Sequence, residues 1–124
     1  MMSKLIYPPE RLTRDGAVII SHNHLCFLHG LLDRPSGVAR SSRDLHRAAL
    51  PYTIYFRSSL SLSCLAKASC TLNVLWVGRE VVGNRIEWSL TERGRAMLTG
   101  MVRVRIPGFG EYQGLQALRR GRST

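Results

Sequence analysis

The feature that most constrains the fold is an abrupt change of hydrophobic period inside the stretch VVGNRIEWSLTERGRAML, residues 81–98. Residues 86–90 alternate apolar and polar side chains, which is the period of a β-strand. Thr91 then stands where an N-cap belongs, and Glu92 lies in the first helical turn, where the helix dipole favours a negative charge. Gly100 follows as a C-cap. The sequence therefore predicts a strand that leads directly into a short capped helix, within a mixed α+β fold.

A β-hairpin is predicted just before this junction. Residues 71–77 and 84–90 are rich in the β-branched and aromatic side chains that are typical of strands. Gly83 and Asn84 form a turn signal, and Gly78 and Gly83 bracket the loop. The charged residues expected at the hairpin tip are Arg79, Glu80 and Arg85.

The N-terminal half of the chain predicts a helix. After an arm with two prolines, the pattern from Thr13 to Leu32 is helical with one possible break, and Thr13 and Asp15 are candidate N-caps. The apolar residues expected on its buried face are Leu25, Phe27, Leu28, Leu31 and Leu32. The turn residues DRPSG, 33–37, end this helix.

A second helix is predicted over SSRDLHRAAL, residues 41–50, with Ser41 or Ser42 as its N-cap. Its inward positions are Leu45, Ala48 and Ala49, and its outward positions are Arg43, His46 and Arg47. Pro51 then interrupts the helix, because the residue before a proline avoids helical angles. Two helices joined by so short a break predict a helix-turn-helix.

Residues 52–68 admit two interpretations. A helix would place Ile54, Leu62 and Leu65 inward, and the run CLAKA consists of helix formers. The alternation SLSLS also suits a strand, with Leu60 and Leu62 on the same side. We take the helix as the prediction. Beyond Gly100 the chain is predicted to be strand-like over residues 101–106, to break at PGFG and to become helical again over residues 115–120.

The elements thus run helix, helix, turn, helix, hairpin, helix, and the residues after the hairpin resemble a family. VVGNRIEWSLTERGRAML is similar to the wing and following helix of bacterial winged-helix transcriptional regulators of the MarR-like and PadR-like kind. In these, an aromatic residue near the end of a strand precedes the motif xLTxxGRxxL. The matching residues are Trp88, Leu90, Thr91, Gly94, Arg95 and Leu98. LCFLHGLLDRP and SSRDLHRAA are similar to the family's first core helix and to the helix that opens its helix-turn-helix, so the resemblance covers roughly residues 24–100.

The resemblance implies a fold and an organisation. We expect an α+β winged helix-turn-helix with three helices, a β-hairpin wing and a further C-terminal helix. Residues 1–12 would form an N-terminal arm, residues 13–100 the winged-helix domain and residues 101–124 a basic C-terminal extension. Regulators of this shape commonly bind two half-sites as dimers. We therefore expect a homodimer through the N-terminal segment, including the start of the first helix, and the segment beyond Gly100.

The charge of the chain indicates an anionic partner. Its net charge is +10, from 18 basic and eight acidic residues. Sixteen of the basic residues are arginine, whose planar fork suits phosphate oxygens and guanine edges. Together with the resemblance, this charge predicts a transcriptional regulator that binds double-stranded DNA.

A helix-turn-helix places its second helix in the major groove, while a wing contacts the backbone or the minor groove. The residues expected to position phosphates are Ser41, Ser42, Arg43 and Arg47. The residues expected to read the groove are Tyr52, Thr53, Arg57, Ser58, Ser59 and Ser61. Arg79 and Arg85 are the expected wing contacts, because narrow minor grooves attract arginine. By contrast, Arg95 is expected to pair with Glu92 on its own helix, and Gly94 to allow close packing.

The sequence gives little support to metal binding or catalysis. His22, Cys26 and His29 would share one helix face, but structural zinc requires four ligands. We therefore expect this face to be exposed or to meet a partner, with no metal or other cofactor. The three cysteines, Cys26, Cys64 and Cys70, have no CxxC spacing and are expected to be free thiols. No HExxH, GxSxG, Walker or Rossmann motif occurs, so the protein is not expected to be an enzyme.

No apolar run reaches the roughly 18 residues of a membrane-spanning helix, and the N-terminus lacks the apolar region of a signal peptide. These features predict a cytoplasmic protein without a membrane partner.

Two alternatives to DNA regulation stay open. A small basic protein without an active site also suits a phage- or mobile-element-encoded inhibitor, such as an anti-CRISPR protein, that binds a protein or nucleoprotein complex. A clean exposed helix over residues 51–70 would favour DNA, whereas a strand-like or buried segment would favour the inhibitor. The arginine-rich tail suggests an RNA- or ribosome-associated protein, but the chain has few aromatic residues for base stacking.

Overall fold

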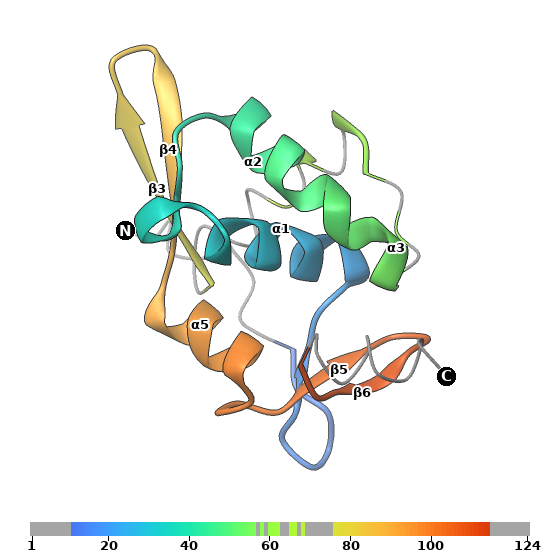
Figure 1. Ribbon diagram of the computed structural model, residues 1–124. Coiled ribbons are helices and arrows are strands. Elements are labelled where there is room, and N and C mark those ends of the chain that lie inside the picture. The colour runs from blue at the N-terminus through green and yellow to red at the C-terminus, as the bar shows by residue number, and fades with distance from the viewer. Residues whose placement is uncertain are drawn as a thin grey trace, which may run out of the picture.

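The computed structural model describes residues 11–56, 58, 60–62, 65, 66, 68 and 76–114. They form an α+β fold of short helices and two three-stranded sheets (Figure 1). The helices are α1 (His22–Leu32), α2 (Ser42–Ala49), α3 (Thr53–Phe56) and α5 (Glu92–Thr99), with the 3-10 turns η2 (Pro35–Gly37) and η3 (Leu50–Tyr52). The strands are β1 (Val18–Ile19), β2 (Val38–Ala39), β3 (Val77–Val82), β4 (Arg85–Leu90), β5 (Val104–Ile106) and β6 (Gly110–Tyr112). None of the helices in these ranges has the length and apolar character needed to cross a bilayer.

α1 lies at the centre of the fold, with α2 on one side and α5 on another (Figure 1). All the residues from 25 to 31 are buried, so the helix is covered on every side over two turns and not along a single stripe. The predicted core residues Leu25, Phe27, Leu28 and Leu31 are fully buried, and Leu32 is partly buried against them. α1 is therefore the element around which the others pack.

α1 begins later than the sequence predicted. Its N-cap is Ser21, whose hydroxyl accepts a hydrogen bond from the His24 backbone N–H. The prediction of a helix from Thr13 is wrong, because residues 18–19 are extended and pair with β5. Thr13 and Asp15, the predicted N-caps, lie in a turn in which the Thr13 hydroxyl donates to the Asp15 carboxylate. Pairing with a distant strand has thus overridden the local helical pattern.

α1 and α2 cross with their backbones in close contact at Gly30. A Cβ atom added to Gly30 would lie 2.7 Å from the carbonyl carbon of Ala48 and 2.8 Å from the nitrogen of Ala49. No side chain fits in that space, so glycine is required at this position. On the other helix, the predicted inward residues Leu45, Ala48 and Ala49 are all buried. The crossing fixes α2 against α1.

The chain does not turn at Pro51. Leu50 and Thr53 both have right-handed helical angles, and η3 joins α2 directly to α3, so residues 42–56 form one continuous path that we name the α2–α3 rod. The buried positions along it are Leu45, Ala48, Ala49, Tyr52 and Phe56. This spacing keeps one face of the rod on α1, and that packing holds Leu50 helical in spite of the following proline. The predicted turn between two helices at Pro51 is therefore wrong.

After the rod, helical residues occur again among those that the structure describes, and we name these residues the second helical stretch. Ser58, Leu60 and Ser61 are non-helical, whereas the helical residues are Leu62, Leu65, Ala66 and Ala68. The prediction of one helix over residues 52–68 is thus right at both ends and wrong in the middle. Leu65 is buried as predicted, but Ile54 and Leu62, which were expected inward, are 67% and 78% exposed.

The predicted hairpin is present and joins the helices through a third strand. β3 and β4 pair antiparallel around the Gly83–Asn84 turn, and β2 pairs with the other edge of β4. The hairpin extends beyond the helices in Figure 1. Arg79 and Glu80 do not lie at its tip, as was predicted, but within β3, opposite Trp88 and Glu87. Most of the predicted first strand, residues 71–75, lies outside the described residues.

α5 follows β4 as the sequence predicted, and its start is locked to the beginning of the hairpin. The hydroxyl of the N-cap Thr91 accepts from the Gly94 N–H at 3.0 Å and donates to the Trp76 carbonyl at 2.8 Å. A Cβ atom on Gly94 would lie 2.3 Å from that same carbonyl oxygen. Close packing at Gly94 is thus confirmed, as is the C-cap Gly100, with φ of 87°.

A second sheet joins the two ends of the described chain. β5 pairs parallel with β1 and antiparallel with β6, and Val104, Ile106 and Tyr112 are buried in the common core. The predicted strand over residues 101–106 is confirmed from Val104 onward. Residues 104–112 therefore pack with the helices, and parts of the two segments expected to form a homodimer surface meet within one chain. The helix predicted over residues 115–120 lies outside the described residues.

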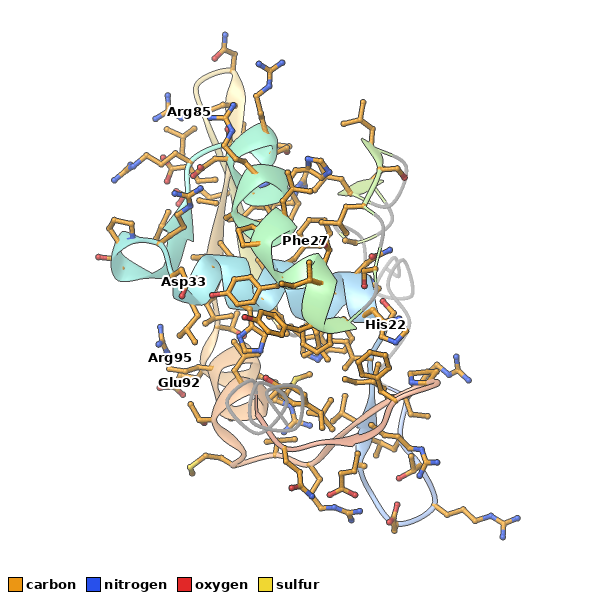
Figure 2. All side chains as sticks on the ribbon, turned by 45° about the vertical axis from the view of Figure 1, so that its right-hand side comes forward. His22, Phe27, Asp33, Arg85, Glu92 and Arg95 are labelled. Carbon is orange, nitrogen blue, oxygen red and sulfur yellow. The ribbon has the colours of Figure 1, made fainter. Side chains whose placement is uncertain are left out.

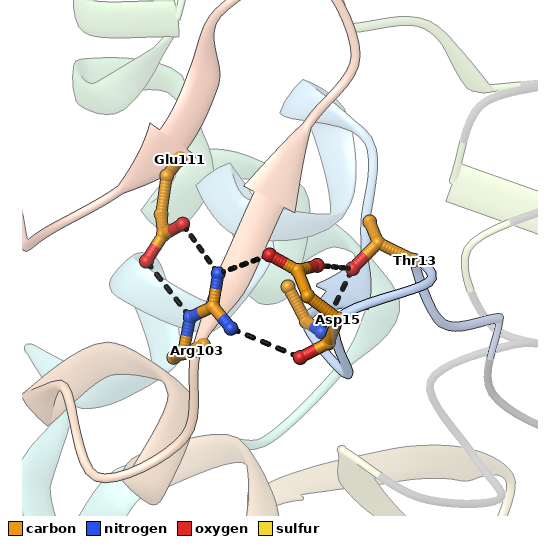
Figure 3. A network of polar contacts seen from close by, with 5 residues as sticks. Thr13, Asp15, Arg103 and Glu111 are labelled. Atoms are coloured by element: carbon orange, nitrogen blue, oxygen red, sulfur yellow. Dashed lines mark hydrogen bonds and ion pairs between the residues drawn. The ribbon is translucent and has the colours of Figure 1, made fainter.

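Arg103 joins this sheet to the turn before β1 (Figure 3). Its guanidinium donates to Asp15 and to Glu111, in each case at 2.8 Å, and to the Asp15 carbonyl at 3.0 Å. Hydrogen bonds from Thr13 and Arg103 lower the pKa of Asp15 to about 2. The hydrogen bond from Arg103 also lowers the pKa of Glu111. Asp15, Arg103 and Glu111 are exposed, and we name this cluster the Arg103 clamp. It orders the turn before β1 but contributes little to the stability of the fold, because surface ion pairs are weak.

We expect Gly94→Ala to destabilise the protein. Alanine is a better helix former than glycine by about 1 kcal/mol, but its Cβ would overlap a backbone carbonyl that cannot rotate away. Overpacking of this kind costs about 1–3 kcal/mol, and we expect a net loss measurable by urea unfolding. Arg95→Ala, at an exposed position of the same helix, is the control and should change stability by less than about 0.5 kcal/mol. Equal stability of Gly94→Ala and the parent chain would contradict the packing at Trp76.

The Arg103 clamp should lose its effect in acid. Carboxyl groups whose pKa is lowered by folding stabilise the folded state above their unfolded pKa of about 4. That contribution disappears as the pH falls from about 4 to about 2, because Asp15 titrates near 2 in the folded chain. We therefore expect the difference in unfolding free energy between the parent and Arg103→Met to shrink over this interval. Arg47→Met, at an exposed position with no carboxylate partner among the described residues, is the control. A difference that stays constant to pH 2 would assign the effect of Arg103 to packing.

Candidate nucleic-acid interface

The start of α2 is held in place by its two serines. Ser41 is the N-cap, and its hydroxyl accepts from the Asp44 N–H at 3.0 Å. The hydroxyl of Ser42 accepts from the indole N–H of Trp88 at 3.3 Å, which ties the helix to β4. Both serines, predicted as phosphate contacts, are half-buried. Their hydroxyls thus orient the helix start.

Two predicted phosphate-positioning arginines lie on the outer face of α2. Arg43 and Arg47 are one turn apart and both are exposed. The nearby carboxylate of Asp44 is engaged elsewhere, because it forms a 2.8 Å ion pair with Arg34 and accepts from the Arg40 N–H. Within the part of the chain that the structure describes, no carboxylate pairs with Arg43 or Arg47. These two positive charges are therefore available to an anionic partner.

Arg79 is linked to the start of α2 through Trp88. The two residues are paired across the hairpin, so their side chains share one face of the sheet. The guanidinium carbon of Arg79 lies 5.9 Å from the centre of the Trp88 ring, within the range of a cation–π interaction. Since the indole N–H of Trp88 also donates to Ser42, one buried ring links Arg79 to the start of α2.

The other face of the hairpin is nearly neutral. Glu80 and Glu87 are paired there, and like charges directly opposite each other are unfavourable. The negative charge of Glu87 is compensated by Arg85 and Arg40, each of which has a guanidinium nitrogen 3.4 Å from the Glu87 carboxylate. Arg40, which sequence reasoning did not single out, is thus a partner of the hairpin, although its position just before the Ser41 cap is a signal that it lies near a helix start. Figure 2 shows Arg85 projecting at the far end of the hairpin.

Two of the six residues predicted to read the groove, Tyr52 and Thr53, have structural contacts. Tyr52 is buried and its hydroxyl donates to the Asp33 carboxylate, so its prediction as a groove contact is wrong. The Thr53 hydroxyl donates to the Leu50 carbonyl at 2.9 Å. Ser58 is half-buried, whereas Ser61 is exposed just before the second helical stretch. Arg57 and Ser59 lie outside the described residues.

The histidine-rich face of α1 points into the protein. Cys26 and His29 are buried and His22 is half-buried, so the expectation of an exposed or partner-facing surface is wrong at Cys26 and His29. Burial raises the pKa of the Cys26 thiol to about 11, which makes it a poor nucleophile or metal ligand. His29 stacks on Tyr52 with ring centres 5.1 Å apart and is hydrogen-bonded through Nε2 to the Tyr112 hydroxyl. The aromatic residues around His29 identify this face as core.

Arg95 and Glu92 are both exposed on α5, away from the end of the hairpin where Arg85 projects (Figure 2). They do not form the predicted ion pair. The Arg95 guanidinium instead extends toward η2, where a Cβ atom on Gly37 would lie 3.4 Å from it.

The exposed arginines of this region are therefore Arg43 and Arg47 on α2 and Arg79 on β3, with Arg85 and Arg40 sharing the charge of Glu87. Comparisons with protein-family models, with curated proteins and with solved structures found no match to the chain.

Proposed function

We propose that the protein binds double-stranded DNA through a winged-helix surface and acts as a transcriptional regulator. The single observation that carries this proposal is the placement of Arg79 beside the start of α2 by the buried Trp88 ring. An arginine held on a hairpin next to a basic helix start is the arrangement by which a wing and a helix contact adjacent phosphates.

The topology supports the same proposal. α1, β2, the α2–α3 rod, a second helical stretch and the β3–β4 hairpin follow one another, and β2 closes a three-stranded sheet in the order β2-β4-β3. In such an arrangement the second helical stretch, with Ser61 and Leu62 exposed at its start, would be the reading element. The turn of the helix-turn-helix then falls after Phe56 and not at Pro51.

The proposal assigns different roles to the arginines. Arg43 and Arg47 would contact phosphates from the rod, and Arg79 would do so from the wing. Arg85 would reach the adjacent minor groove from the hairpin end. Two copies on paired half-sites would suit the dimeric binding common to such regulators.

Residues 51–70 were expected to discriminate between DNA binding and protein inhibition, and their described part has features of both. Tyr52, Phe56, Leu65 and Ala68 are buried, so the segment is not one exposed helix. Its described residues are nevertheless helical over two stretches, and Leu62 is 78% exposed. One clean exposed helix, the condition for DNA, is therefore not met, and by this criterion the buried residues favour the inhibitor. The DNA proposal rests on Arg79 and Trp88 instead.

We expect the double variant Arg79→Ala, Arg85→Ala to weaken duplex binding and to flatten its dependence on salt. Each phosphate contact contributes roughly 0.9 to the slope of log K against log salt, so the slope should fall by about 1–2. The measurement is fluorescence anisotropy with a labelled duplex over a salt series.

The matched control is Arg14→Ala, Arg105→Ala. It removes the same two charges from exposed positions near the β1–β5–β6 sheet, at the other end of the molecule from the hairpin (Figure 1). A slope that falls equally in both double variants would indicate a diffuse charge effect and would contradict a DNA-binding wing.

Glu87→Gln should have the opposite effect. The carboxylate of Glu87 neutralises part of the charge of Arg40 and Arg85, and glutamine keeps the size of the side chain while releasing both arginines. We expect duplex affinity at low salt to rise by several-fold, on the order of one added phosphate contact. The same anisotropy titration measures it. Unchanged or weaker binding would show that the neutral face of the hairpin does not approach DNA.

A further inference from the structure

The α2–α3 rod has an outward stripe that the proposed DNA contacts do not fully use. Its exposed positions are Arg43, Arg47, Leu50, Pro51 and Ile54. Arg43, Arg47, Leu50 and Ile54 follow the spacing i, i+4, i+7, i+11, which is a single helix face. The η3 turn preserves this face, because the chain stays helical through Pro51. The stripe is therefore continuous over about three turns, or roughly 16 Å.

The two halves of this stripe differ in character. The first half carries Arg43 and Arg47, which have no carboxylate partner among the described residues. The second half is apolar, since Leu50 is 45% exposed and Ile54 is 67% exposed. Single exposed apolar residues are common on protein surfaces, but here two lie one turn apart and continue the line of Arg43 and Arg47.

Duplex DNA complements only half of this stripe. Phosphates satisfy Arg43 and Arg47 but offer no apolar surface to Leu50 and Ile54. A second copy of the rod would not complement it either, because the exposed positions of the stripe include no acidic residue. An α-helix with acidic residues near one end and a row of leucine-like residues along the same face would satisfy both halves at once.

We propose that the outward stripe of the α2–α3 rod, Arg43, Arg47, Leu50 and Ile54, is a docking surface for an acidic amphipathic helix of a partner protein. The inference is independent of DNA binding and shares with it only the basic half of the stripe.

The rod is packed in place within the chain alone. The inner face of the rod is fixed on α1 by the backbone contact at Gly30 and by the buried residues Tyr52 and Phe56. A partner helix would thus dock without ordering the rod, and this lowers the entropic cost of association. Arg43 and Arg47 would set the direction of the partner helix, since its acidic end must lie over them.

The test uses the full chain and a labelled synthetic helical peptide of about 16 residues. The peptide has leucine at i, i+4, i+7 and i+11, glutamate flanking its first two turns and alanine elsewhere. A second peptide of the same charge has serine in place of each leucine. Binding is measured by fluorescence anisotropy at physiological salt, where the attraction between exposed charges more than about 8 Å apart is largely screened. We expect the leucine peptide to bind at least about tenfold more tightly than the serine peptide.

The variant that isolates the apolar half is Leu50→Gln, Ile54→Gln, which changes no charge. This variant should bind the leucine peptide at least about tenfold more weakly than the parent chain does, and its duplex binding should be unchanged. Val81→Gln is the matched control, because Val81 is 66% exposed on the hairpin and its loss should leave peptide binding intact. Circular dichroism confirms that each variant is folded.

Two results would overturn the docking proposal: equal binding of the leucine and serine peptides, or equal binding of the leucine peptide by the parent and the Leu50→Gln, Ile54→Gln variant. Neither result affects the proposal of DNA binding, which the Arg79→Ala, Arg85→Ala variant tests separately. Conversely, loss of duplex binding by Arg79→Ala, Arg85→Ala with retained peptide binding would separate the two surfaces.

Discussion

The fold depends on the backbone contact between α1 and α2 at Gly30. Because Gly30 has no Cβ, the two helices approach until their main chains touch, and no side chain would fit between Gly30 and Ala48. This close approach buries Ala48 and Ala49 of the rod. That contact sets the position of α2, and through Ser42 and Trp88 the position of α2 sets that of β4. The hairpin and the arginines on it are consequently positioned by a residue that carries no side chain.

The parts of the fold that were predicted correctly are those specified by neighbouring residues. Thr91, Gly94 and Gly100 define α5 because a cap, a close contact and a left-handed terminus each depend on one residue type. The Gly83–Asn84 turn specifies the hairpin in the same way. Pro51 gave the wrong prediction because a local preference was opposed by packing of the whole rod against α1, which cannot be read from the residues on either side.

The sequence predicted the candidate site correctly where the periodicity of a helix decides which side chains are exposed. It failed where the pairing of strands decides their exposure. Arg43 and Arg47 are exposed as their spacing on α2 predicted. Arg79 was wrongly predicted to lie at the hairpin tip. Its true position opposite Trp88 is set by the strand register, and this register depends on where β3 begins, which the local sequence does not specify. Tyr52 was expected to face a groove, although its hydroxyl meets Asp33 near the end of a different helix. Contacts of this kind join residues that no local pattern connects.

The parallel pairing of β1 with β5 has a consequence for how the protein folds. Val18 is paired with Val104, and His29 on the central helix is hydrogen-bonded to Tyr112. These contacts span most of the described chain, so closing them requires a large loss of chain entropy before any burial compensates for it. During synthesis, α1 and the rod can associate early, but one side of α1 stays uncovered until the last described strand has left the ribosome. The order of the strands thus makes completion of the core a late step.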